Sequence, residues 1–227
     1  MLAAIALLGL GACHRAGSPS PAAADPDPAG RSLLEEANRE LGLARDTAYT
    51  HLTRIDEAAG RFHVDCSGFV GYALARAAPE ALDELRAATI RRPLAEHFVS
   101  FFESLPGRPE IARWQAVRRA TELEPGDLLA WLEPADVASS NTGHVMIVRG
   151  PAAPDPDRPD LLAVPVIDAT AVPHGKTDSR KAAHRTGLGT GEVLLVVDPR
   201  GTPIAYRWSR GIRAREHATT IAMARLR

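Results

Sequence analysis

The sequence predicts a domain of the α+β class, in which helices come first and an antiparallel sheet follows. Two observations predict this class. Helical patterns fill residues 32–105, and short apolar segments bounded by Gly, Pro and Asp fill the chain from residue 127 onward. Runs of helices followed by runs of strands are typical of α+β domains. The length of 227 residues fits one such domain, expected over 32–227, with an N-terminal extension.

The first segments are predicted to be helical. Residues 32–45 open with Ser32 three residues before Glu35, the spacing of a capping box. Further helices are expected over 66–77, over 79–88 behind Pro79, and over 93–105, where Pro106 and Gly107 follow. We interpret residues 80–120 as a helical insertion or lid over the domain.

The second half is predicted to be a sheet. Residues 198–201 (Asp-Pro-Arg-Gly) form a turn, so the strands on either side should make a hairpin. Residues 151–159 are predicted to be a loop. Residues 187–191 (Gly-Leu-Gly-Thr-Gly) lack the spacing of a phosphate-binding loop and are interpreted as a flexible turn. The expected strands are 127–132, 144–149, 163–169, 192–197, 202–208 and 219–224.

The charge balance excludes several classes of protein. The chain has 27 basic and 28 acidic residues, and 45% of its residues are hydrophobic. A disordered chain would have lower hydrophobicity and higher net charge. A binder of nucleic acid that depends on overall charge would be basic, so no nucleic-acid partner is expected. Two cysteines cannot form a disulfide-dense scaffold. We expect a monomer.

The N-terminus is typical of an export signal. Residues 2–10 are almost entirely apolar, which is too short to span a bilayer but fits the core of a signal peptide. They end in Leu10-Gly11-Ala12-Cys13, which resembles the lipobox of bacterial lipoproteins. The resemblance implies cleavage before Cys13, lipidation of its thiol, and a membrane anchor in the bacterial cell envelope. Residues 14–31, rich in Pro and Ala, would be a flexible tether. No Lys or Arg lies between Met1 and Cys13, so an apolar N-terminus with an incidental cysteine is the alternative.

Cys66 is the strongest candidate for a nucleophile. The segment Asp65-Cys66-Ser67-Gly68-Phe69-Val70 places a thiol at the start of an apolar helix. The positive end of a helix dipole favours a thiolate, and the free N–H groups there can hold an oxyanion. An inert core thiol is the alternative.

A base and an orienting acid are expected on two later strands. His144 opens an apolar strand, and Asp168 lies in the next one, in Val-Ile-Asp-Ala-Thr. On neighbouring strands Asp168 could orient the imidazole while His144 activates the thiol. His144 as a core histidine, Asp168 as a turn residue and His63 as a rival base are the alternatives. His174, Asp178 and His184 fit no metal-ligand pattern and are interpreted as a polar loop.

The order of these motifs resembles the NlpC/P60 superfamily of papain-like cysteine peptidases. The resemblance rests on Asp-Cys-Ser-Gly-Phe-Val, on Pro-Gly-Asp-Leu at 125–128 and on Gly-His-Val at 143–145, and covers roughly residues 40–170. It implies a papain-like fold, with the Cys helix packed on the sheet. It also implies a triad of Cys66, His144 and Asp168.

The resemblance extends to the substrate. Tyr49 is the counterpart of a tyrosine upstream of the nucleophile, and Asp65 and Ser67 are further substrate-binding candidates. Ordinary packing is the alternative for Tyr49. The resemblance implies cleavage of amide bonds in peptidoglycan peptides without a metal or an organic cofactor. A non-catalytic wall-binding lipoprotein, and an amidase or acyltransferase with another substrate, remain alternatives.

Overall fold

The computed structural model describes residues 28–211 and 214–227. The predicted signal peptide, the lipidation site Cys13 and residues 14–27 of the predicted tether lie outside these residues. Residues 28–31, which we expected in the tether, belong to the first helix. Within the described residues, no helix is both long and apolar enough to cross a membrane.

Helices α1 to α4 come before all the strands of the large sheet in the chain. The helices expected at 66–77 and 79–88 are confirmed at their predicted bounds. Pro79 occupies the first turn of its helix, where a missing N–H costs nothing. The bounds are α1 Pro28–Leu43, α2 Cys66–Ala77, α3 Pro79–Ala88, α4 Ala95–Ser104 and α5 Ser179–Ala183. Short 3-10 turns lie at Leu105–Gly107 and Ala120–Glu122.

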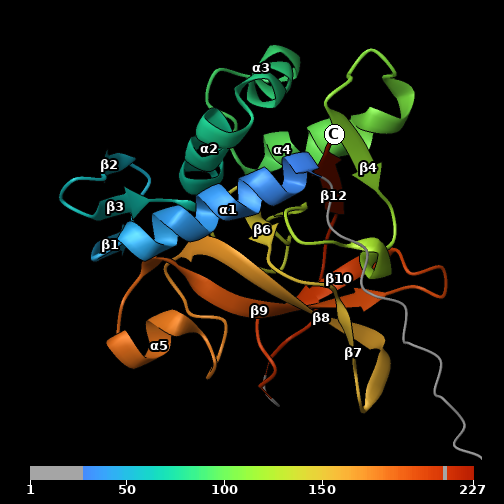
Figure 1. The fold of residues 1–227 in the computed structure, drawn as a ribbon. Helices are drawn as coiled ribbons and strands as arrows, with labels where there is room; N and C mark the ends of the chain where they lie inside the picture. Colours follow the sequence, from blue (N-terminus) through green and yellow to red (C-terminus); the bar gives the residue numbers. More distant parts are fainter. Residues whose placement is uncertain (1–27, 212–213) are drawn as a thin grey trace, which may run out of the picture.

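A nine-stranded antiparallel sheet forms the body of the domain, which confirms the α+β class. Along the sheet the order is β11-β10-β9-β8-β6-β5-β12-β4, with β7 paired to β8. Helices α1 to α4 gather over one side of this sheet, while α5 lies apart from them next to β9 (Figure 1). The strands are β4 Trp114–Val117, β5 Leu128–Leu132, β6 Gly143–Val148, β7 Ala153–Asp155, β8 Arg158–Thr170, β9 Gly187–Val197, β10 Pro203–Arg207, β11 His217–Ala218 and β12 Ile221–Leu226.

A second, three-stranded sheet was not predicted from the sequence. It consists of β1 (Asp46–Tyr49), β2 (Arg54–Asp56) and β3 (Arg61–Val64), with β1 and β3 parallel. Strand β3 leads directly into α2, and β1 contacts β9. The small sheet therefore fixes the start of α2 beside the large sheet.

The interpretation of residues 80–120 as a lid is wrong. Helix α4 packs against β5, β6 and β12, and its side chains Phe98, Phe101 and Phe102 are buried in the main core. Residues 114–117 form β4, which pairs with β12 at the edge of the large sheet. The apolar face of an amphipathic helix is stabilised when it is removed from water. This segment is therefore part of the core.

Two predicted loops are also strands. Residues 153–155 form β7, and Arg158 begins β8, so most of the segment 151–159 belongs to a hairpin. Residues 187–191 are the first part of β9 and pair with residues 166–170 of β8, so they are not a flexible turn. The hairpin predicted around 198–201 is confirmed by the antiparallel pairing of β9 and β10.

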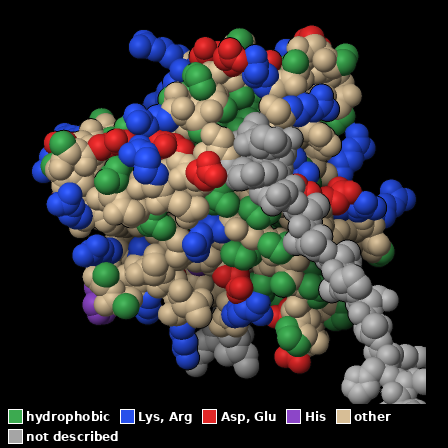
Figure 2. Space-filling view, in the orientation of Figure 1, with side chains coloured by type: hydrophobic (Ala, Val, Ile, Leu, Met, Phe, Trp, Pro, Cys, Tyr) green, Lys and Arg blue, Asp and Glu red, His purple; other side chains and the backbone are tan. Residues whose placement is uncertain are grey.

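The apolar residues divide into two main clusters, one on each face of the large sheet. Alternate residues of β6 show the division, since Val145 packs beneath the helices and Met146 packs on the opposite face. The sheet curls, so that Tyr206 of β10 shares the second cluster with Met223 of β12. Basic and acidic side chains are interspersed over the face seen in Figure 2, in keeping with the balanced composition.

Candidate functional site

Cys66 is the first residue of α2, as predicted. Asp65 caps the helix: its Oδ1 accepts hydrogen bonds from the Gly68 N–H at 2.6 Å and from the Ser67 hydroxyl at 3.1 Å. The N–H groups of the first turn have no acceptor within the helix. Cys66 is 6% exposed. The thiol therefore lies at the positive end of α2, with backbone donors beside it.

His144 is the second residue of β6 and is buried. The preceding Gly143 has φ +132°, and a Cβ there would lie 1.9 Å from the Trp131 carbonyl oxygen, so only glycine fits this approach between β5 and β6. The imidazole packs against Trp131 and Trp208, with ring centroids 5.6 Å and 5.1 Å away. This packing restricts the orientation of the ring.

Asp168 lies in β8, next to β6, and has no exposed surface. Its Oδ2 lies 2.6 Å from His144 Nε2. Burial opposes the charge of this carboxyl group, but the electrostatic influence of His174 and Arg180 and the hydrogen bonds from the two imidazoles outweigh it. They hold the pKa of Asp168 well below its usual range. Asp168 is therefore ionised and orients His144.

Cys66 lies close enough to His144 to influence its charge. Burial alone would lower the pKa of His144. The negative charge at Cys66 and hydrogen bonds to Asp168 and to Cys66 outweigh burial and raise this pKa to about 10. Since Nε2 is bound to Asp168, Nδ1 is the ring nitrogen that remains for the thiol. The structure brings the three predicted triad residues together.

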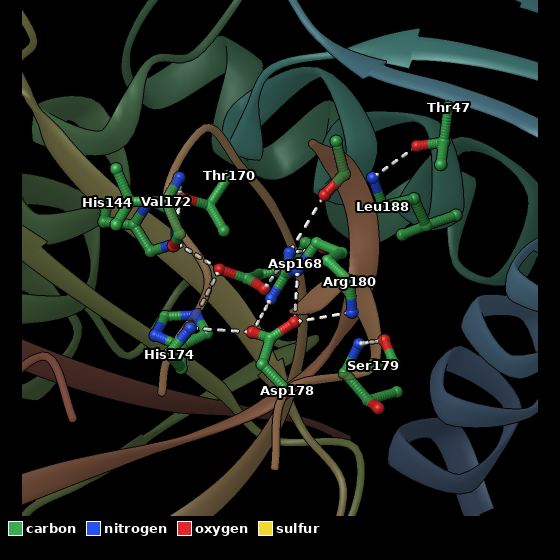
Figure 3. A network of polar contacts seen from close by, with 12 residues as sticks. Thr47, His144, Asp168, Thr170, Val172, His174, Asp178, Ser179, Arg180 and Leu188 are labelled. Carbon is green, nitrogen blue, oxygen red and sulfur yellow. Dashed lines mark hydrogen bonds and ion pairs between the residues drawn. The ribbon is translucent and has the colours of Figure 1, made fainter. Parts of the chain in front are cut away.

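A second histidine joins this group and was missed from the sequence. His174 Nε2 lies 2.9 Å from Asp168 Oδ2, the same oxygen that binds His144 (Figure 3). The guanidinium of Arg180 lies 2.9 Å from Asp168 Oδ1. Its Nη1 donates its hydrogen bonds to the carbonyls of Asp168 and Gly187, so the contact with Oδ1 is an ion pair without an aligned hydrogen bond. Asp168 is thus surrounded by two imidazoles and a guanidinium.

Asp178 holds His174 and Arg180 in position. It caps the short helix α5, accepts from the His174 N–H at 2.7 Å, and binds Arg180 through both of its oxygens. His174 and Asp178 lie outside helices and strands, as the interpretation as a polar loop expects, but they are buried together with Arg180, at 2–3% exposure. His184 is exposed and has φ +50° at the end of α5.

Alternating glycines of β9 make room for these side chains. A Cβ at Gly189 would lie 2.7 Å from Arg180 Cγ, and one at Gly191 would lie 2.6 Å from His174 Cδ2. A Cβ at Gly187 would lie 2.4 Å from Thr47 Oγ1, whose hydroxyl accepts a hydrogen bond from the Leu188 N–H. Side chains two apart in a strand share a face, so the pattern Gly-x-Gly-x-Gly marks this buried contact.

A metal ion does not fit this cluster. His144, Asp168 and His174 offer ligand atoms within 4.8 Å of one another. Both Nε2 atoms, however, are hydrogen-bonded to the same carboxylate oxygen, and the Arg180 guanidinium adds a positive charge at the other oxygen. A cation would be repelled by that charge and would displace both hydrogen bonds. We therefore assign no metal to these residues.

Two neighbouring cavities adjoin Cys66 and His144. One, of about 100 Å³, is lined by Cys66, Ser67 and Asp65. The other, of about 340 Å³, contains His144 with Trp131, Glu133, Tyr206 and Trp208. Both cavities share the lining residues Tyr49, Asn141 and Gly143. Together they form a cleft in which a substrate could lie across the thiol and the imidazole.

The remaining predicted site residues are placed as follows. Tyr49 stands where the two cavities meet, and burial, followed by the negative charges at Cys66 and Asp65, raises its pKa. Asp65 and Ser67 line the smaller cavity, but their side chains bind each other at the helix start. His63, the rival base, lies in β3 with its Nε2 2.9 Å from Asp46 Oδ1, so its ring is engaged elsewhere.

Comparison with known proteins gives a relative of viral origin. An uncharacterized protein, R653, of Acanthamoeba polyphaga mimivirus is 32% identical over 174 residues, which cover 66% of this chain and 70% of the relative. No protein-family model and no solved structure matches the chain. At this identity and coverage, the chain belongs to the same protein family as the mimivirus protein R653.

Proposed function

We propose that this protein is a cysteine hydrolase that cleaves amide bonds with Cys66, His144 and Asp168. One observation carries the proposal: a thiol at a helix N-terminus faces a buried histidine whose far nitrogen is bound to an ionised carboxylate. This is the arrangement that nucleophilic catalysis by a thiolate needs. The location within a cleft supports it, because both reacting groups line cavities that a substrate can enter.

The reaction follows from these positions. The Cys66 thiolate attacks the amide carbon, and the resulting oxyanion accepts hydrogen bonds from the N–H groups at the start of α2. The bond from carbon to nitrogen breaks as the His144 imidazolium gives its proton to the leaving amine, which leaves a thioester on Cys66. Water then attacks the thioester carbon while His144 takes the proton, and the acid leaves as the thiolate re-forms.

The substrate class rests on the resemblance to the NlpC/P60 superfamily. That resemblance implies amide bonds in peptidoglycan peptides, in an enzyme anchored to the cell envelope through Cys13. The larger cavity lies on the side of His144, which protonates the leaving amine, so the leaving group would occupy it. Its aromatic walls and single carboxylate, Glu133, suit a residue with an apolar stem and a positive charge.

The test is digestion of purified peptidoglycan by the purified chain, with the released fragments identified by mass spectrometry. We expect new amine and carboxyl termini from one type of amide bond, and Cys66→Ser should abolish their release. Cys13→Ser is the matched control, because it removes the other cysteine and should leave the rate in detergent unchanged. Binding to peptidoglycan without any cleavage, equal in Cys66→Ser, would contradict hydrolysis and indicate a wall-binding protein.

Thiol reactivity gives a second measurement that needs no substrate. Iodoacetamide near neutral pH should modify Cys66 in the folded protein, because the helix terminus and the imidazolium stabilise the thiolate. Asp168→Asn should slow this modification, since the imidazolium loses its partner. Modification of Cys66 only after denaturation would show an inert core thiol and overturn the proposal.

A further inference from the structure

One carboxylate oxygen of Asp168 is bound by two histidines. His144 Nε2 and His174 Nε2 lie 2.6 Å and 2.9 Å from its Oδ2. An ionised carboxylate only accepts hydrogen bonds, so both rings donate an N–H to this atom. A triad needs only the bond between His144 and Asp168. The bond from His174 fixes the position of Asp168 Oδ2, the oxygen that His144 binds.

Among the contacts of the His174 ring, only the hydrogen bond from Nε2 to Asp168 explains why a histidine stands at this position. Its Nδ1 is buried and has no hydrogen-bond partner among the described residues. A buried nitrogen without a partner is destabilising, so nothing on that side explains a histidine here. The ring lies against Trp208, with centroids 4.1 Å apart, and this contact would suit any flat apolar side chain. Only the bond from Nε2 to Asp168 requires an imidazole.

The backbone of His174 is held by Asp178. The backbone N–H of His174 donates to Asp178 Oδ2 at 2.7 Å, and Asp178 binds the guanidinium of Arg180. Arg180 also lies against Asp168 Oδ1. The two oxygens of Asp168 are therefore approached from different directions. Without the bond to His174, the ion pair with Arg180 would act against only one remaining bond, that of His144.

We propose that His174 is a positioning residue of the active site, which keeps Asp168 Oδ2 directed at His144 and so keeps the His144 ring directed at Cys66. This inference rests on the proposed cysteine hydrolase. His174 lines neither cavity, and its hydrogen bond reaches the His144 ring through Asp168. Loss of its donor lets the carboxylate turn toward Arg180, which weakens the support of the His144 imidazolium.

Three variants separate this role from packing. His174→Phe keeps a flat ring against Trp208 but has no donor. His174→Gln keeps an N–H near the position of Nε2, and His174→Asn carries one that is too short to reach Asp168. We expect kcat to fall about 10- to 100-fold in His174→Phe and His174→Asn, with KM changed less than about 3-fold. His174→Gln should recover most of kcat. Equal losses in all three variants would overturn the inference.

The pH profile provides a readout that packing alone would not move. The groups that face the His144 ring or its partners are Cys66 of α2, Asp168 of β8, His174 after β8, Arg180 of α5, Tyr49 of β1 and Glu133 after β5. In the proposed mechanism the alkaline limb of kcat/KM reports loss of the proton from His144. In His174→Phe this limb should move to lower pH, because Asp168 supports the imidazolium less.

Nuclear magnetic resonance titration of the imidazoles makes the result independent of turnover. In the chain without substrate, the titration midpoint of His144 should be lower in His174→Phe than in the wild type, and close to wild type in His174→Gln. His184→Asn is the matched control, since His184 is exposed and asparagine tolerates its backbone conformation. A shifted midpoint in a chain that cleaves nothing would sustain the positioning role while the proposed hydrolase fails. An unshifted midpoint in both His174→Phe and His174→Asn would overturn the role itself.

Discussion

Asp168 and Glu40 are both fully buried, and their environments drive the two carboxyl groups to opposite states. Asp168 and Glu40 both have 0% exposure. Asp168 is bound by two imidazoles and lies beside a guanidinium, and its pKa is held well below the usual range. Neither oxygen of Glu40 finds a hydrogen-bond partner in the described residues. Burial, and then the negative charge of Glu36, raise the pKa of Glu40 to about 9.

Partners, and not burial, decide whether these two buried carboxyl groups carry charge. Burial disfavours the charged form in both places. Asp168 is contacted by imidazoles from β6 and from the segment after β8 and by a guanidinium from α5. Glu40 in α1 has no such partner in the described residues, and the negative charge of Glu36 acts against a charge on it. A buried carboxyl group that stays charged because specific partners bind it, such as Asp168, is a candidate functional residue. A buried carboxyl group that becomes neutral, such as Glu40, gives no such indication. Four substitutions test this contrast.

Asp168→Asn should have the largest effect. It keeps the shape but removes the charge that supports the His144 imidazolium, so kcat should fall by about 10²- to 10⁴-fold. The stability contributed by a carboxylate of lowered pKa is present at neutral pH and is lost as pH falls below its unfolded value, near 3.8. Acid unfolding followed by circular dichroism should therefore be less steep in the variant. Activity within a few fold of wild type would remove Asp168 from the mechanism.

Arg180→Met should come next, measured by urea unfolding. It removes the guanidinium that accompanies two buried carboxylates, Asp168 and Asp178, and breaking such a group typically costs about 3–5 kcal/mol. Arg158→Met is the control, because Arg158 forms its ion pairs at the surface and its removal should change stability little. A loss no greater than that of the control would show that Asp168 does not depend on Arg180.

Glu40→Gln should act in the opposite direction and stabilise the fold above neutral pH. The folded protein holds a proton on Glu40 that the unfolded chain releases near pH 4.5, so wild-type stability falls as pH rises from about 4.5 to about 9. We expect the variant to gain about 1–3 kcal/mol at pH 8 and little at pH 4. Glu35→Gln, on the exposed side of α1, is the control. Equal pH dependence in wild type and Glu40→Gln would refute a protonated Glu40.

Glu133→Gln should have the smallest effect. Glu133 is half-buried in the larger cavity, has no ion-pair partner among the described residues, and helps burial to raise the pKa of Tyr206 to about 12. A protonated amine in the leaving group would supply the missing partner. We expect KM for such a substrate to rise about 3- to 10-fold, with no change for the same substrate after acetylation of that amine. Equal KM changes for both substrates would argue against this contact.

Strong local signals made much of the fold predictable. Helix α2 begins after its capping residue Asp65, and α3 begins at Pro79. Such helix starts can be predicted because one or two residues of the right type identify them. Cys66, His144 and Asp168 were found because each stands at the start of an apolar helix or within an apolar strand. That they meet was inferred from motif order, and the structure brings them together.

The features that were missed depend on contacts distant in sequence. Strands β1 and β3 pair in parallel over Asp46–Tyr49 and Arg61–Val64, and neither has an alternating apolar pattern long enough to stand out. His174 and Arg180 lie in a polar segment that became interior only because β9 offers glycines at 189 and 191. The alternation of glycines was visible in the sequence and was interpreted as a turn, although the period of two indicates a strand with a close neighbour.

Strand β12 gives the large sheet an unusual order of assembly. It comes last in the chain order, yet it lies between β4 and β5 and pairs with both. During synthesis, two hydrogen-bonding edges therefore stay open until residues 221–226 have left the ribosome. Limited proteolysis of a chain ending at Thr220 should cut near Trp114–Val117, and resistance there would contradict this order. A chain that stops before residues 221–226 would hold Cys66 and His144 without β12 in the sheet beside them, so the proposed active site would be complete only once β12 has paired.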